Sequence, residues 1–197
     1  MVSLTRLTGT CSVVGGSAWT AACLVHDTLP QGCIDASCAD RPMRGSSPAD
    51  SALFTLAGLM LATAFLGLLL LARRSGRGRG PLVVAAGVTG AAGLTLLLAA
   101  EITSTFIDGN WGGMPGLVLP GIALLAIGLA LTAVVVIRAR VLPRGLPALL
   151  LATVVLLPFA NEQTSRILLA VPFGLTWLGA GVLLLRGQEH RRTSALA

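Results

Sequence analysis

An uncharged run from Pro81 to Ala100 restricts the possible folds of this chain more than any other stretch does. Its twenty residues, PLVVAAGVTGAAGLTLLLAA, contain no ionisable side chain. As an α-helix rising about 1.5 Å per residue, such a run reaches about 30 Å, the thickness of a bilayer's hydrocarbon core. Backbone N–H and C=O groups find no water in lipid, so a crossing segment must satisfy them internally, as a helix does. The run therefore predicts a transmembrane helix, which Glu101 follows directly.

Composition excludes two broad classes of protein. Only 11% of the 197 residues are charged, whereas soluble domains have about 25%, so a soluble globule is excluded. The isoelectric point near 10.9 is typical of nucleic-acid-binding proteins. However, the arginines lie in short loops beside apolar runs, where membrane orientation explains them. The chain has no Tyr and only eight aromatic residues, too few to stack bases, so we expect no nucleic-acid partner.

Five further apolar stretches complete an all-α fold, a polytopic transmembrane helical bundle with six spans. One transmembrane domain covers residues 1–186, with an outer loop at 26–50, and a polar cytoplasmic tail follows at 187–197. Pro120 is expected to kink or restart the fourth span, and Pro172 to lie inside the sixth. The predicted spans are about 7–25, 51–72, 81–102, 116–137, 146–160 and 166–185.

The first span has a second interpretation. A positive residue, Arg6, precedes a moderately apolar stretch, as in a signal peptide. The sequence Thr20-Ala21-Ala22 matches a small-residue cleavage site poorly. A retained first helix is therefore the preferred interpretation, and cleavage stays open.

Arginine placement predicts the orientation. With six spans and a cytoplasmic N-terminus, eleven arginines lie inside and three outside. Short cytoplasmic loops carry such an excess of Arg and Lys. We therefore expect both termini in the cytoplasm and a multi-pass protein of the cell (inner) membrane. Its first partner is the lipid bilayer.

A group of polar residues near the outer ends of the spans is the candidate site. Glu101 ends the third span, and Asn161, Glu162 and Arg166 lie between the fifth and sixth. An ionisable residue at a span marks a possible functional site, and together these side chains could relay a proton or bind a cation. The structural alternative is that Glu101 is hydrated at headgroup depth. In that case Glu162 pairs with Arg166 one helical turn away, and Asn161 caps the sixth helix.

The cysteines suggest structural rather than catalytic roles. Cys33 and Cys38 share the outer loop, where a disulfide can form, and two free thiols are the alternative. A metal site that adds His26 is a weak third possibility, because CxxxxC is a poor zinc pattern. Cys11 and Cys23 lie in the first span and are predicted to be small packing residues.

Small residues on two spans predict close helix packing. Ala86, Thr89, Gly90 and Gly93 fall on one face of the third span. Small side chains let helix backbones approach closely in lipid. Gly174, Gly179 and Gly181 are expected to do the same in the sixth span.

No reaction motif is present. The chain lacks GxxxxGK[ST], HExxH and GxSxG. Its two histidines, His26 and His190, fall on opposite sides of the predicted membrane. No nucleophile–base pair emerges, so we expect no catalytic residue, no metal and no cofactor, and an enzyme is disfavoured.

The second half of the chain resembles a group of proteins. In order it reads LPGIALLAIGLAL, RARVLPRG, NEQTSR and LLAVPFGLTWLGAGVLLLR. These segments resemble small six-span integral membrane proteins of high-GC bacteria, which have no assigned activity. The resemblance covers residues 116–186 best, and it implies an architecture but no activity.

Two functional hypotheses follow. The first is a non-catalytic accessory subunit that binds a membrane-protein partner or a second copy of itself. The second is a small permease or proton-coupled carrier that uses Glu101, Glu162 and Arg166. A carrier needs polar groups at mid-membrane, and here they lie near one surface.

Overall fold

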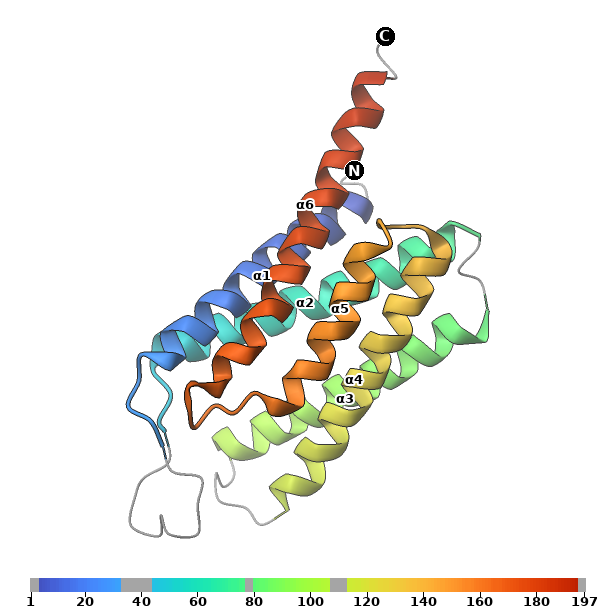
Figure 1. Ribbon diagram of the computed structural model, residues 1–197. Helices are drawn as coiled ribbons and strands as arrows, with labels where there is room; N and C mark the ends of the chain where they lie inside the picture. The colour runs from blue at the N-terminus through green and yellow to red at the C-terminus, as the bar shows by residue number, and fades with distance from the viewer. Residues whose placement is uncertain (1–3, 33–43, 77–79, 107–112, 195–197) are drawn as a thin grey trace. The chain divides into compact units, whose positions relative to one another are not determined.

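The protein is all-helical over the residues described by the computed structural model, 4–32, 44–76, 80–106 and 113–194 (Figure 1). Each predicted span corresponds to a helix. The α-helices there are α1 (Leu4–Asp27), α2 (Pro48–Arg74), α3 (Pro81–Phe106), α4 (Met114–Ala139), α5 (Gly145–Leu156) and α6 (Val171–Ser194). Two 3₁₀ segments, η2 (Leu157–Phe159) and η3 (Ser165–Ala170), lie between α5 and α6.

Four of the helices in the described ranges are long and apolar enough to cross a membrane. They are Pro48–Arg74, Pro81–Ala100, Met114–Ala139 and Ser165–Gly187. The apolar helix Gly145–Phe159 is shorter, and α1 is diluted by Gly, Ser and Thr residues. These helices mark the chain as a multi-pass membrane protein.

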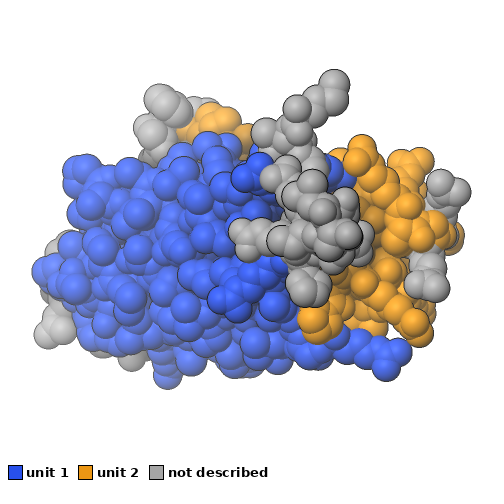
Figure 2. Space-filling view, turned by 90° about the horizontal axis from the view of Figure 1, so that it is seen from above, with its two compact units in different colours: residues 1–67, 144–197 blue, residues 68–143 orange. Residues whose placement is uncertain are grey.

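The chain divides into two compact units, which Figure 2 colours separately. The first contains residues 1–67 and 144–197, and the second contains residues 68–143. The division falls within α2.

Helices α1 and α6 lie side by side in the first unit and run antiparallel (Figure 1). Glycines of each helix meet the backbone of the other. A Cβ on Gly16 would lie 2.5 Å from the carbonyl oxygen of Gly174, and one on Gly181 would lie 2.5 Å from that of Gly9. Real Cβ atoms do not approach so closely, so these glycines allow backbone contact.

Glycines also allow close backbone contact between α3 and α4 in the second unit. A Cβ on Gly128 would lie 2.6 Å from the Cα of Gly90, and one on Gly93 would clash with the backbone of Leu125. The small-residue face predicted on the third span is thus confirmed as a packing surface. In the sixth span Gly174 and Gly181 pack against α1, whereas Gly179 only has ordinary contact with Leu146 of α5.

The structure adds detail at two prolines and at the polar tail. Pro120 was expected to kink or restart the fourth span, and it does not restart it, because α4 is continuous from Met114 to Ala139. Pro172 lies inside the sixth span as expected, in the first turn of α6, which begins at Val171 directly after η3. Proline suits that first turn, where its missing N–H has no acceptor to serve. The polar tail is helical up to Ser194, because α6 continues through it.

Candidate functional site

The predicted polar group is only partly described. Glu101 lies in α3 of the second unit, and its side chain is outside the described part of the structure. Asn161, Glu162 and Arg166 belong to the first unit. The side chains of Glu162 and Arg166 are exposed. A site that joins Glu101 to these residues stays a prediction.

The local role predicted for Asn161 was wrong. The helical segment begins at Ser165, and Thr164 caps it by accepting a hydrogen bond from the backbone N–H of Arg166. Asn161 instead accepts a bond from the backbone N–H of Gln163 at 2.8 Å. Asn side chains commonly form such turns with their own backbone two residues on. Among the described residues, ion pairs join His26 to Asp50 and Arg44 to Asp27, and none joins Glu162 to Arg166.

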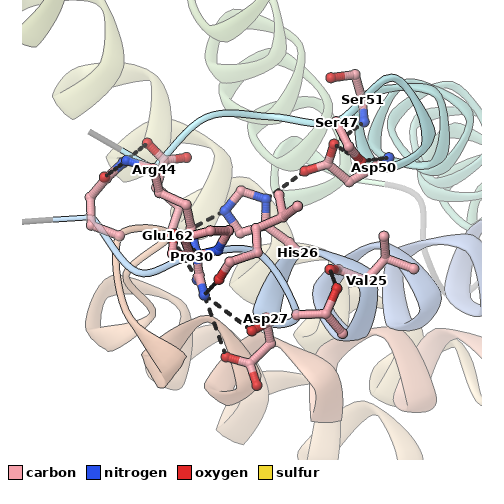
Figure 3. Close-up of polar contacts among 12 residues, drawn as sticks. Val25, His26, Asp27, Pro30, Arg44, Ser47, Asp50, Ser51 and Glu162 are labelled. Carbon is pink, nitrogen blue, oxygen red and sulfur yellow. Dashed lines mark hydrogen bonds and ion pairs between the residues drawn. The ribbon is translucent and has the colours of Figure 1, made fainter. Parts of the chain in front are cut away.

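The structure instead gathers polar groups around Arg44, shown in Figure 3. Its side chain is fully buried, and its five guanidinium N–H groups meet five backbone carbonyls. Nε donates to Pro30 at 3.2 Å. Nη1 donates to Glu162 at 3.0 Å and Thr164 at 3.3 Å, and Nη2 to Asp27 at 3.1 Å and Leu29 at 2.7 Å.

This arrangement serves the C-terminal end of α1. The last carbonyls of a helix have no intrahelical donor and carry partial negative charge, so a cation there is favourable. Arg44 supplies donors to this end and to the turn before η3 at once. The carboxylate of Asp27 lies 4.0 Å from Nη2 and offsets the buried charge. Arg44 thereby joins the loop after α1 to the connection between α5 and α6.

Gln163 makes a second link between these two segments. Its carbonyl accepts from the backbone N–H of Gly32 at 3.0 Å, and its side-chain oxygen accepts from the backbone N–H of Arg44 at 2.6 Å. A Cβ on Gly32 would collide with that side-chain oxygen. Glycine at this position is therefore required by the close approach.

His26, at the end of α1, lies between two acceptors (Figure 3). Its Nδ1 is 2.5 Å from Oδ2 of Asp50, and its Nε2 is 3.1 Å from the carbonyl oxygen of Glu162. Both side chains are buried, with exposed fractions of 8% for His26 and 1% for Asp50. A buried ion pair is stable only when further hydrogen bonds satisfy its members, and here they do.

Asp50 is positioned by the start of α2. Ser47 is the N-cap of that helix and accepts from the backbone N–H of Asp50 at 3.2 Å. Oδ1 of Asp50 accepts from the hydroxyl of Ser47 and the backbone N–H of Ser51, both at 2.9 Å. Pro48 occupies the first helical position, where proline is favoured. The Ser47 and Asp50 side chains therefore bond each other at the helix start, as in a capping box, except that Asp50 accepts from the Ser47 hydroxyl and not from its backbone N–H. Oδ2 of Asp50 is left pointing to His26.

Aromatic rings pack beside this polar group. Phe54 stands edge-on to His26, with 6.1 Å between ring centres, and edge-on to Trp19 at 5.6 Å. Trp19 also meets Phe173 at 5.5 Å and donates its indole N–H to the carbonyl of Ala170 at 3.0 Å. Such pairs stabilise by about 1 kcal/mol each beyond burial. They connect α1, α2 and α6 beneath the polar group.

Sequence reasoning missed the roles of Arg44 and Asp50 and considered His26 only as a metal ligand. One signal was readable, because Ser47-Pro48-Ala49-Asp50 matches a capping-box helix start. No sequence pattern connects Arg44 to the carbonyls of residues 162 and 164, which lie more than a hundred residues away.

Neither possibility raised for Cys33 and Cys38, a disulfide or a metal site with His26, is tested by the structure. In the part of the chain that the structure describes, no three His, Cys, Asp or Glu side chains lie close enough to hold a metal ion. Cys33 and Cys38 fall outside those residues, so their disulfide stays a prediction. Cys11 and Cys23 are buried free thiols, which confirms them as packing residues.

Comparison with known proteins adds no assignment. No protein-family profile, curated protein or solved structure matches the chain.

Proposed function

We propose that the chain is a six-span protein of the cell membrane, with both termini in the cytoplasm, and that it acts as a non-catalytic subunit binding another membrane protein. The observation that carries this proposal is how the buried charged groups are used. Arg44, His26 and Asp50 all bond to the chain's own atoms. They hold loops together, and none of these three side chains is left as a free nucleophile or base. Helix α1 is retained in this proposal, because it packs closely against α6.

One face of α3 supports a partner rather than lipid alone. Val84, Val88 and Leu98 are 63%, 62% and 60% exposed. They share a stripe with Ala91 and Thr95, which are also exposed. The Thr95 hydroxyl is satisfied by the carbonyl of Ala91 at 2.9 Å. Two small residues four positions apart allow a second transmembrane helix to approach closely, so we assign this stripe to a partner's helix.

The six-span topology has its own test. Reporter fusions after Arg74, Asp108 and Arg192 should read cytoplasmic, external and cytoplasmic, because arginine-rich short loops stay inside. Alkaline phosphatase and green fluorescent protein give opposite signals on the two sides of the membrane. An external signal after Arg74 or Arg192 contradicts the proposed orientation.

The subunit role is tested by photo-crosslinking in intact cells. A photoreactive amino acid at Val84, Val88 or Leu98 should give one discrete larger protein adduct. Leu119 of α4, which is 67% exposed, is the matched control and should react with lipid. A carrier gives the opposite result, with no protein adduct and with a proton-linked flux in proteoliposomes that Glu101→Gln abolishes.

A further inference from the structure

We propose that His26 and Asp50 form a proton-dependent latch between the end of α1, the start of α2 and the turn at residues 161–164. The latch is closed when the pair holds one shared proton, and it loosens when that proton is lost. This inference does not depend on the proposed subunit role. It rests on which atoms at the pair can donate and which can only accept.

The closed state needs a proton on each side of the imidazole ring. A backbone carbonyl only accepts, so Nε2 must carry hydrogen to bond the carbonyl of Glu162 at 3.1 Å. A neutral ring has one N–H, which leaves a lone pair on Nδ1. Nδ1 is 2.5 Å from Oδ2 of Asp50, so a second proton must lie between these two atoms. Whether it rests on nitrogen or oxygen, both contacts are then satisfied.

Losing the shared proton breaks one contact. With hydrogen kept on Nε2, the Nδ1 lone pair faces a carboxylate. With hydrogen moved to Nδ1, the Nε2 lone pair faces the carbonyl of Glu162. Two acceptors opposed in a buried site are strongly unfavourable. A further proton also weakens the pair, because a neutral carboxyl group is a weaker acceptor than the Asp50 carboxylate.

The charged groups around the His26–Asp50 pair limit the effect of proton loss to the turn at residues 161–164. Arg44 Nη1 donates to the same Glu162 carbonyl, and Asp27 lies 4.0 Å from Arg44. Arginine side chains remain charged in proteins. The bonds from Arg44 to the carbonyls of Glu162 and Thr164 therefore persist when the bond from His26 is lost. The Glu162 carboxylate is exposed, and Phe54 covers the ring edge-on. Proton loss therefore raises the opening frequency of the turn without undoing the fold.

Asp50→Asn separates a latch from a merely structural pair. The amide oxygen can keep the bonds from Ser47 and Ser51 that Oδ1 now accepts. The amide nitrogen then takes the place of Oδ2 and donates to the Nδ1 lone pair. The neutral ring keeps its Nε2 hydrogen for Glu162. This variant satisfies every contact without the shared proton, so it should stay closed where the wild type opens.

The test uses the full-length protein in lipid nanodiscs with His190→Gln, which leaves His26 as the single imidazole. Nitrogen-15 NMR follows the protonation of both ring nitrogens. Hydrogen exchange of the Gly32 amide, which bonds the carbonyl of Gln163 at 3.0 Å, reports opening as a protection factor corrected for intrinsic rate. In the wild type, the protection factor of the Gly32 amide should fall about tenfold or more as the shared proton is lost. A change of this size corresponds to the loss of one hydrogen bond to a charged group.

The variants decide between outcomes. Asp50→Asn should hold Gly32 protection constant over the same pH range, and Asp27→Asn, the control, should keep the wild-type response. Equal pH responses in wild type and Asp50→Asn overturn the proposal. If Asp50→Asn does not fold, the wild type decides alone, because proton loss at His26 without a change at Gly32 equally overturns it.

Discussion

Replacing Arg44 with Met should be among the most damaging single changes in this chain. Five backbone carbonyls lose the N–H donor that Arg44 provides, and Asp27 loses its buried counter-charge. Removing one member of a buried charged network costs about 3 to 5 kcal/mol. For a chain of this size we expect a fall of about 10 °C in the apparent Tm, measured in one detergent.

Two further variants make this result specific. Arg44→Lys keeps the charge but offers three donors in place of five, so its Tm should fall between wild type and Arg44→Met. Arg138→Met is the control, because that side chain is exposed at the end of α4, and its Tm should stay within about 1 °C. If Arg44→Met melts like Arg138→Met, the cluster does not hold the two segments together.

Adding one methyl group at Gly16 should destabilise the first unit nearly as much. The new Cβ would lie 2.5 Å from both the carbonyl oxygen of Gly174 and the backbone nitrogen of Leu178. These are backbone atoms that cannot swing aside, so α1 and α6 must separate. Overpacking of this kind costs about 1 to 3 kcal/mol, which should appear as a lowered Tm of Gly16→Ala in detergent.

Gly58→Ala is the matched control, and its effect on the Tm should be zero or opposite in sign. A Cβ on Gly58 of α2 meets nothing within 4 Å, and alanine favours a helix over glycine by about 1 kcal/mol. Gly58→Ala should therefore leave the Tm unchanged or raise it. Gly16→Ala combined with Gly174→Ala should cost less than the sum of the single changes, because the first already separates the helices. A Gly16→Ala protein that melts at or above wild type contradicts the close backbone contact.

The apolar runs predicted the helices well. Each of the six predicted spans corresponds to a helix, and the third begins at Pro81 as expected. The face with Gly90 and Gly93 was also readable, because small residues at helical spacing mark a contact surface. The sequence did not predict which helix packs on that face. Gly121 and Gly128 of α4 are recognised as its contacts only in the structure, where α3 and α4 lie against each other.

The connection before α6 shows where local reasoning stopped. Asn161 was expected to cap a helix, but the chain forms a turn there and the helical segment starts four residues later. The reason is tertiary, because the carbonyls of Glu162 and Thr164 are turned towards Arg44. A continuous helix from Asn161 would have used the Glu162 carbonyl internally.

The sequence by itself determined that the chain is helical and enters lipid, because uncharged runs of this length must satisfy their backbone internally and bury apolar surface. Only the tertiary structure decided what the polar residues do. Arg44, His26 and Asp50 are separated by up to 24 positions along the chain, and their acceptors at residues 162 and 164 are more than a hundred positions further on. Hydrogen bonds depend on distance and direction in space, so no local pattern could have assigned these residues to one another.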